Sequence, residues 1–484
     1  MPETTSAAAI KPQGLLRELN VSHAVAIVVG TVIGSGIFRV PGTMIRDVGS
    51  AKVVYLAWIV GGLLSFFGAL TYSELGAMRP QAGGEYVYVR DGYGPLLGFL
   101  YGWTWFVIAK PASIATITVG LTDALSSLSR FNFLSQPAAA HLTLTWAQFV
   151  AIGATILISF INYIGVRRAG VFQLIATSLK VAMLVGIAVI GFSYSGGSWA
   201  NFATRFTGAH GGFNGFMLAL VAALWAYDGW NDLNMVGGEI RNPERSIPIA
   251  LIAGVAVVAA LYMLMYAAVQ FVLPADALGA SKSPASTMAL VVLGSAGAAL
   301  ITAGIALSML VTLNGTIMSG GRIPYAVARD GYFFRSLAAV SPRFHTPSNA
   351  LLVQAILSIL LLLIAATFKQ LLDLAIFAEW LFYMIAASTI FVFRKREPNA
   401  VRPYKAWGYP FVPALFIISA GFLLYYTFKD NLETTFIPAW PHSWINSLAV
   451  AGVALIAAGV PVYWGFAKKK LAADLSRRAA DERR

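Results

Sequence analysis

Two apolar segments of the chain are interrupted by residues that disfavour a continuous helix. The first covers residues 30–38 and the second covers residues 225–232. Unwinding a helix leaves free N–H groups at the start of one half-helix and free carbonyl groups at the end of the other. N–H ends attract anions and carbonyl ends attract cations, so two such breaks could bind a solute that carries both charges.

The centre of the first break is suited to binding an anion. Gly34 and Gly36 permit irregular backbone and close approach of a ligand, and Ser35 adds a hydroxyl donor. The alternative is that these glycines only allow two membrane helices to pack closely. Irregular backbone at membrane depth persists only where it lines a cavity or is buried in protein. A matched pair of breaks in two halves of a chain therefore predicts the substrate site of a solute transporter.

Composition places these segments in a membrane. Hydrophobic residues make up 58% of the 484 residues, charged residues make up 11%, and the mean hydropathy is +0.71. Twelve runs are apolar and long enough to cross the hydrocarbon core, so we expect an all-α membrane protein with twelve transmembrane helices. The runs lie near residues 23–46, 51–78, 94–124, 144–166, 169–194, 213–239, 247–273, 289–318, 348–367, 370–394, 409–428 and 444–466.

The charge distribution predicts orientation rather than nucleic-acid binding. The chain carries 34 Lys and Arg against 21 Asp and Glu, a net charge of +13. With both termini in the cytoplasm, most of these cations fall in cytoplasmic segments, as the positive-inside rule requires. We therefore expect a multi-pass protein of the cell membrane. The chain has no cysteine, which excludes disulfides and thiolate metal sites.

The spans can be divided into two units of five, each opening with a broken helix. An odd number of crossings forces the second unit to enter from the opposite side, which gives a five-plus-five inverted repeat followed by two additional helices. The expected divisions are a cytoplasmic N-terminal segment (1–22), the two repeats (23–194 and 213–394), spans eleven and twelve (409–466) and a basic cytoplasmic tail (467–484). The loop at residues 83–91 is amphipathic, and we expect a short interfacial helix there.

The motifs GTVIGSGIF (30–38), GGEYVYVRDGYGPLLGFLYGW (83–103), KPASIA (110–115) and WAYDGWNDLNMVGGEIRNPERSIP (225–248) resemble one known family. NGTIMSGGR (314–322) and REPNAVRPY (396–404) match it as well. The chain resembles the amino acid–polyamine–organocation (APC) superfamily, in its L-amino-acid transporter branch. This resemblance implies sodium-independent L-amino-acid transport, commonly by exchange. Animal members pair with a glycoprotein through a cysteine, and a chain without cysteine excludes a disulfide-linked partner subunit.

The resemblance also implies roles for residues at the breaks. The N–H groups of Ser35 and Gly36 hold the substrate carboxylate, while the carbonyls of Val32, Trp225 and Asp228 hold its ammonium. The predicted substrate-binding residues are Val32, Ser35, Gly36, Ile37, Trp225, Asp228, Trp230, Asn231 and Trp380.

Several side chains near the breaks leave alternatives open. We expect Trp225, Trp230 and Asn231 to shape the pocket for the substrate side chain, and Trp225 also to gate the site. Trp380 either lines the far wall of this pocket or packs against lipid or the protein core. Asp228 either pairs with a cationic substrate or caps a half-helix. Glu379 could serve either purpose.

Lys180 lies twelve residues after Arg168, roughly 18 Å along a helix and so near the bilayer centre. Intramembrane lysines usually mark function. The resemblance places the ammonium of Lys180 near Gly34 and Ser308, where sodium-coupled relatives bind the ion. Gly34, Lys180 and Ser308 are therefore predicted coupling residues. The alternative is a structural lysine satisfied by carbonyls. For Lys110 we favour the structural role, with its ammonium satisfying a carbonyl freed by Pro111.

Other functions fit the sequence less well. No HExxH or GxSxG motif occurs and the histidines fall at span ends or in loops, which argues against an enzyme. No cofactor or metal site is expected. The predicted function is sodium-independent transport of L-amino acids, small or medium neutral and possibly cationic, by alternating access and exchange. Proton-coupled uptake and a transporter-like amino-acid sensor are the alternatives.

Overall fold

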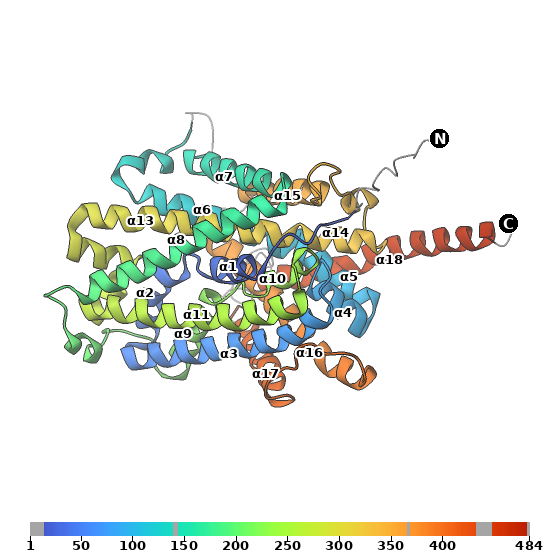
Figure 1. Ribbon diagram of the computed structural model, residues 1–484. Helices are drawn as coiled ribbons and strands as arrows, with labels where there is room; N and C mark the ends of the chain where they lie inside the picture. The colour runs from blue at the N-terminus through green and yellow to red at the C-terminus, as the bar shows by residue number, and fades with distance from the viewer. Residues whose placement is uncertain (1–13, 139–143, 365–367, 432–447, 482–484) are drawn as a thin grey trace, which may run out of the picture.

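The computed structural model describes residues 14–138, 144–364, 368–431 and 448–481. These residues form helices joined by short connections, with isolated β-bridges in place of a sheet (Figure 1). Residues 1–13 of the predicted N-terminal segment, the first residues of the predicted twelfth span and the last three residues of the predicted tail lie outside the described part of the chain.

The helices up to residue 203 are α1 (Val21–Val32), α2 (Gly36–Val48), α3 (Ala51–Met78), α4 (Glu85–Tyr93), α5 (Pro95–Thr104), the π-helix η1 (Trp105–Ala109), α6 (Lys110–Ser126), the 3₁₀ helix η2 (Ser129–Ser135), α7 (Trp146–Tyr163), α8 (Val166–Phe192) and the 3₁₀ helix η3 (Trp199–Ala203). α5, η1 and α6 run on as one long element.

The remaining helices are α9 (Gly212–Ala226), α10 (Asp232–Met235), the 3₁₀ helix η4 (Gly237–Glu239), α11 (Pro243–Val272), α12 (Ala275–Ala280), α13 (Pro284–Gly320), α14 (Arg322–Arg329), the 3₁₀ helix η5 (Arg335–Ala338), α15 (Ser348–Ile364), α16 (Phe368–Arg396), α17 (Phe411–Asn431) and α18 (Leu448–Asp481). α13 is kinked at Gly294, whose φ of +72° suits glycine.

Many of these helices have the length and composition of membrane spans. Seven helical stretches in the described residues are long and apolar enough to cross a bilayer: Val21–Val48, Ala51–Met78, Pro95–Ser126, Trp146–Tyr163, Val166–Phe192, Pro243–Val272 and Pro284–Arg329. Shorter apolar helices cover Gly212–Ala226, Ser348–Ile364 and Phe411–Tyr426. The exposed apolar side chains on them suit a lipid environment.

The first predicted interruption separates α1 from α2. α1 begins with a capping box, in which Asn20 accepts from the backbone N–H of His23 at 3.0 Å. It ends where Ile33 adopts φ −73° and ψ 82°, close to an inverse γ-turn, and the N–H of Gly34 donates to the carbonyl of Val32 at 2.7 Å. α2 then starts at Gly36.

The second predicted interruption separates α9 from α10. α9 ends at Ala226, and residues 227–231 form a turn before the single helical turn of α10. Gly229 has a φ of +101°, which side chains rarely adopt, and a Cβ there would lie 2.9 Å from Cγ2 of Thr31. The turn therefore needs glycine both for its backbone and for its contact with α1.

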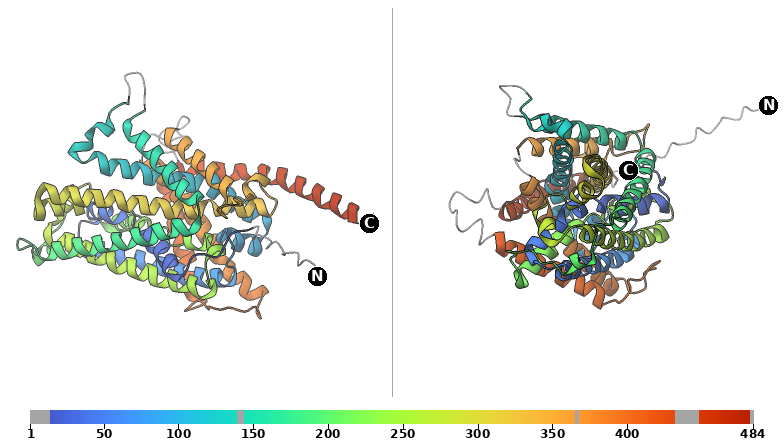
Figure 2. Two further views of the ribbon diagram at one scale, coloured as in Figure 1. Left: turned by 45° about the horizontal axis from the view of Figure 1, so that its top comes forward. Right: turned by 90° about the vertical axis from the view of Figure 1, so that its left-hand side faces the viewer.

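The two breaks lie against each other inside the bundle. α1 packs on α8, α11 and α13, and α2 packs on α9 (Figures 1 and 2). The hydroxyl of Tyr262 on α11 lies 3.0 Å from the carbonyl oxygen of Val32 and 2.8 Å from that of Ala226. One side chain thus bridges the ends of α1 and α9.

The loop at residues 83–91 contains the helix that the sequence predicts, and much of that helix is covered by the rest of the protein. In α4, residues Glu85, Tyr86, Val87, Tyr88 and Val89 are buried. Glu85 can be buried because Asn231 and Tyr101 donate hydrogen bonds to its two carboxylate oxygens, at 2.6 and 3.1 Å. α4 is therefore part of the protein interior.

Candidate functional site

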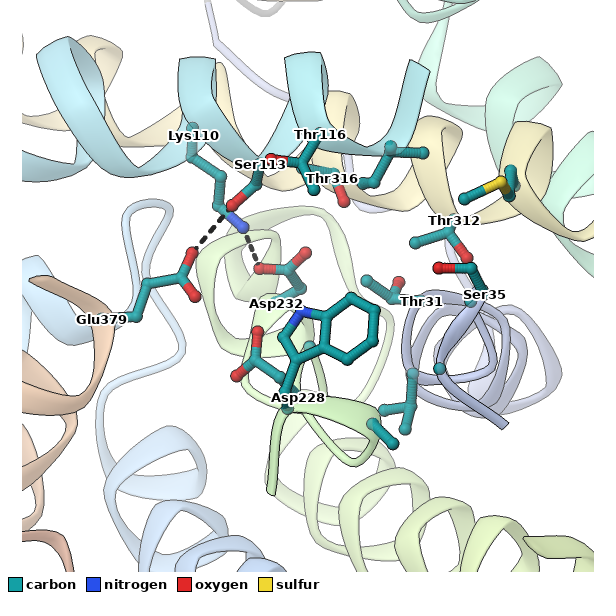
Figure 3. Close-up of a pocket in the computed structure, with 18 residues that line it drawn as sticks. Thr31, Ser35, Lys110, Ser113, Thr116, Asp228, Asp232, Thr312, Thr316 and Glu379 are labelled. Carbon is teal, nitrogen blue, oxygen red and sulfur yellow. Dashed lines mark hydrogen bonds and ion pairs between the residues drawn. The ribbon is translucent and has the colours of Figure 1, made fainter. Parts of the chain in front are cut away.

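A cavity lies between the two breaks and is lined by residues of both. Its walls come from both breaks and from α6, α13 and α16 (Figure 3). The lining residues are Thr31, Val32, Gly34, Ser35, Gly36, Lys110, Ser113, Thr116, Ile117, Trp225, Ala226, Asp228, Gly229, Asp232, Met309, Thr312, Thr316 and Glu379.

One end of the cavity is formed by the N-terminus of α2. Ser35 and Gly36 line it there, and the first N–H groups of a helix have no partner within their own helix. Ser35 sits at the N-cap position without a side-chain capping bond, so its hydroxyl is not used to cap α2. Together with the helix dipole, this end can hold a carboxylate.

Gly36 has a packing role as well. A Cβ at this position would lie 2.9 Å from both Cα and Cβ of Ala226, at the end of α9. At Gly34, the nearest atom to an added Cβ would be the Thr312 hydroxyl oxygen at 3.6 Å, an ordinary contact. Close helix packing, the alternative weighed for both glycines, therefore applies at Gly36 and not at Gly34.

Helices α6 and α13 each contribute one polar face. Ser113 and Thr116 on α6 are three residues apart and Thr312 and Thr316 on α13 are four apart, so in each pair both side chains lie on the same face of the helix. Hydroxyl groups at Thr31, Ser35, Ser113, Thr116, Thr312 and Thr316 make much of the wall polar.

The charged groups gather at the other end (Figure 3). The ammonium of Lys110 pairs with the carboxylate of Asp232, and both side chains are buried. The Ser113 hydroxyl donates to Glu379 at 3.0 Å, and the hydroxyl of Tyr383 donates to Asp228 at 2.9 Å. Lys110 does not bind a carbonyl freed by Pro111, as the sequence suggested, but a carboxylate of the second break.

Asp228 is not a helix cap. The N-cap position of α10 is Asn231, and Asp228 instead lines the cavity with its carboxylate bonded to Tyr383. Glu379 also lines the cavity, and Asp232, which the sequence analysis did not single out, lies beside them. Ser113, Thr116 and Thr316 also line the cavity but were not predicted from the sequence. The signal that could have identified them is the recurrence of polar residues at helical spacing along α6 and α13.

Lys180 lies behind the first break rather than in the cavity. Its ammonium donates to the carbonyls of Gly30, at 2.8 Å, and Ile33, and lies 3.4 Å from the Thr312 hydroxyl. The hydroxyl of Ser308 donates to the same Ile33 carbonyl at 3.0 Å. The ammonium thus sits at the C-terminal end of α1, where the helix dipole favours a cation. These are the contacts of a structural lysine whose ammonium is hydrogen-bonded to backbone carbonyls, one of the two roles that the sequence left open.

Four of the predicted substrate-binding residues do not line the cavity. Ile37 is buried in the core, and Trp230 packs edge-on against Tyr72 at 4.9 Å between ring centres. Trp380 packs against Tyr383 at 5.7 Å. Asn231 bonds to Glu85 and accepts from the Tyr383 hydroxyl at 3.1 Å.

For Trp230 and Asn231 the physical reason is the turn at residues 227–231. Gly229 has a positive φ, and Asp228 before it lines the cavity while Trp230 after it contacts α3 and α17. Trp230 fits there because residue 68 on α3 is glycine: a Cβ at Gly68 would lie 2.7 Å from the indole ring.

The carbonyl of Val32 already has two donors within reach, the Gly34 N–H and the Tyr262 hydroxyl. A substrate ammonium would have to displace one of them, because a carbonyl oxygen has two lone pairs. The Trp225 carbonyl accepts from the Asp228 N–H at 3.2 Å. Trp225 itself lines the cavity and is half-buried.

A chain of hydrogen bonds connects the cavity to α4. Tyr383 contacts both Asp228 and Asn231, and Asn231 donates to Glu85. Burial raises the pKa of Glu85 to about 7, although hydrogen bonds from Asn231 and Tyr101 oppose this shift. Glu85 therefore changes its protonation near neutral pH.

Comparison with known proteins identifies the family of the chain. The amino acid permease family model matches residues 19–458. The serine/threonine exchanger SteT of Bacillus subtilis is 32% identical over 464 residues, covering 94% of this chain and 98% of the relative. The b(0,+)-type amino acid transporter 1 of Mus musculus is 29% identical over 469 residues, covering 96% and 93%. The human cystine/glutamate transporter is 30% identical over 454 residues, covering 93% and 85%.

These relatives are transporters rather than enzymes, and they cover nearly the whole chain. The two broken helices, the polar cavity between them and this full-length similarity lead to the same family. The chain belongs to the amino acid permease family, among the L-amino-acid transporters of the APC superfamily.

Proposed function

We propose that the protein carries L-amino acids across the membrane without sodium, by alternating access and exchange. The main support is the polarity of the cavity: the N-terminus of α2 and the Ser35 hydroxyl lie at one end, and Asp228, Asp232 and Glu379 lie at the other (Figure 3). An α-amino acid carries a carboxylate and an ammonium, so its two charges match the two ends.

Sodium independence is supported by the position of the Lys180 ammonium. The carbonyls of Gly30 and Ile33 and the hydroxyl of Thr312 are oxygen ligands of the kind that alkali ions use, and Lys180 donates to them. A fixed cation occupies these oxygens, so a transported one is not needed. Uptake from choline medium equal to uptake from sodium medium is expected. Loss of uptake in choline would contradict the proposal.

For the substrate side chain we propose small or medium neutral groups. Six hydroxyl-bearing residues line the cavity, and the indole of Trp225 takes up space beside them. Hydroxyl groups can hydrogen-bond small polar side chains, whereas a large apolar substrate would leave some of them unpaired.

A second candidate, cationic amino acids, is favoured by Asp228 and Glu379. Both carboxylates line the cavity, whereas the carboxylate of Asp232 is already paired with Lys110. A substrate ammonium or guanidinium would gain a charge-assisted bond there.

A competition panel separates the two candidates. Alanine, serine, leucine and arginine would be tested against labelled substrate in the parent, in Asp228→Asn and in Glu379→Gln. If arginine competes in the parent and fails in the variants, the cationic candidate stands. If arginine competes in none of them, the neutral assignment stands.

Exchange is tested in proteoliposomes with and without internal amino acid. We expect uptake of radiolabelled amino acid only when amino acid is present inside. Uptake that persists without internal substrate and rises with an inward proton gradient would replace exchange by proton coupling. Binding without any uptake would indicate a sensor instead.

We further propose the topology inferred from the sequence. The two broken helices α1–α2 and α9–α10 would open two inverted five-helix units, with α17 and α18 as spans eleven and twelve of the cell-membrane protein. Both termini would face the cytoplasm, and no disulfide-linked subunit would be needed because these 484 residues contain no cysteine. Cysteine accessibility labelling at Lys468 and Lys282, replaced one at a time, should show them on opposite sides.

A further inference from the structure

A second hollow, which shares no lining residue with the cavity between the breaks, lies between the segment from α14 to η5 and the middle of α18. Four basic residues line it: Arg329, Arg335, Lys469 and Lys470. α18 projects from the bundle at the end where α4, α5 and α14 lie (Figure 1). By the positive-inside rule, this end faces the cytoplasm.

The positive charge of the hollow is not balanced by its own residues. The lining residues include one carboxylate, Asp330, and that carboxylate already pairs with Arg90 and accepts from the Tyr86 hydroxyl at 2.8 Å. Lys470 is held in place, because it donates to the Asp330 carbonyl oxygen at 2.8 Å and lies 4.1 Å from the ring centre of Tyr332. Four cations therefore line the hollow together with one carboxylate, which is already paired with Arg90.

Exposed apolar side chains border these cations. Phe334 is 61% exposed and stacks edge-on with Phe466, with 5.1 Å between ring centres. Trp464 and Leu471 on α18 are also more than half exposed. Aromatic residues beside basic ones are typical of the level where lipid headgroups meet acyl chains.

We propose that this hollow binds the phosphate group of an anionic phospholipid from the cytoplasmic leaflet. The cations hold the phosphate, and the acyl chains lie along Phe334, Phe466 and Trp464. A soluble anion would use the charges but not the exposed aromatic groups. A lipid uses both, and basic hollows beside spans at this face suit anionic headgroups.

The test compares two pairs of neighbouring cations. In the first variant, Arg335→Ala and Lys469→Ala remove two cations from the hollow. In the control, Arg343→Ala and Lys468→Ala remove two exposed cations that do not line it. Native mass spectrometry of protein titrated with phosphatidylglycerol measures the apparent affinity. Phosphatidylcholine serves as the neutral lipid.

We expect phosphatidylglycerol to bind the parent and the control equally, and to bind the first variant roughly 30-fold more weakly, since each cation near the headgroups contributes a factor of about five. High salt should weaken binding to the parent. Equal affinity of both variants would overturn the proposal. So would displacement of the lipid by millimolar inorganic phosphate, or equal binding of phosphatidylcholine. Matching melting curves of the two variants in phosphatidylcholine would confirm that both are folded.

Discussion

The two helix breaks use a buried lysine in different ways. At the first, Lys180 from α8 bonds to backbone carbonyls at the end of α1. At the second, Lys110 from α6 pairs with the side chain of Asp232, directly after the turn. The first break presents N–H and hydroxyl groups to the cavity, whereas the second presents carboxylates.

Because of this difference, the structure of the first break depends mainly on backbone contacts, whereas that of the second depends on the side chains of an ion pair. Bonds to carbonyls hold backbone and do not depend on the side chains of the break, so Lys180 acts on the shape of α1. An ion pair between side chains depends on both partners, and losing either leaves a buried charge. The first break should therefore tolerate changes in its own side chains better than the second, and the following variants test this.

The largest effect is expected at the ion pair. Lys110→Met leaves Asp232 buried without its cation beside Asp228 and Glu379, and should cost roughly 3–5 kcal/mol of unfolding free energy. Asp232→Asn should cost less, because Lys110 keeps carboxylates nearby. Thermal unfolding in detergent measures both.

The double variant Lys110→Met with Asp232→Asn is the control, because it removes both charges. It should recover stability relative to Lys110→Met, yet transport slowly. A double variant as unstable as the sum of the single ones would show that the pair does not act as a unit.

A smaller effect is expected for Lys180→Ala. The carbonyls of Gly30 and Ile33 lose their charged donor, and we expect transport to slow roughly tenfold, the equivalent of about 1.4 kcal/mol. Substrate binding should change less than transport, because Lys180 does not line the cavity. Exchange rates and equilibrium binding are compared, with the exposed Lys52→Ala as a control. Equal loss of both would place Lys180 in substrate binding.

Two neighbouring glycines give a finer comparison within the first break. Gly36→Ala forces a Cβ against Ala226 and should cost roughly 1–3 kcal/mol through overpacking. Gly34→Ala meets only the ordinary contact with Thr312 and should retain most of the stability. The unfolding temperatures of the two variants are compared with that of the parent. A similar decrease in both variants would reject the packing role assigned to Gly36.

The smallest effect below pH 4.5 is expected for Glu85→Gln, which connects to the second break through Asn231. The folded pKa of Glu85, about 7, exceeds the ordinary value of 4.5. Its favourable contribution is therefore complete below pH 4.5 and is lost as the pH rises through about 7. The glutamine variant should lose this slope, matching the parent below pH 4.5 and exceeding its stability at pH 7 and above. A parallel pH profile would contradict the shift.

Much of this site could be predicted from the sequence, because glycine-rich interruptions inside long apolar runs are local signals. The breaks follow from such signals, whereas the family and the location of Lys180 near Ser308 were implied by the resemblance of longer motifs to a known family. Which side chains face the cavity does not. Asp228 and Trp230 are two residues apart, yet the positive φ of Gly229 directs them to different neighbours.

Pairings between distant segments were also beyond the sequence. Lys110 and Asp232 are 122 residues apart, and either could have bonded to backbone or water. The loop at residues 83–91 indicated an interfacial helix because its sequence is amphipathic, and Glu85 counted among its polar residues. The burial of Glu85 depends on donors from Asn231 and Tyr101, which only the fold brings together.

The contact between Gly68 and Trp230 constrains how the sequence can change over evolutionary time. Any side chain at residue 68 would overlap the indole ring, so a larger residue there becomes acceptable only after residue 230 has shrunk. The reverse order passes through an intermediate with a disrupted core. Lineages that carry a side chain at position 68 should therefore also carry a smaller residue at position 230, acquired first.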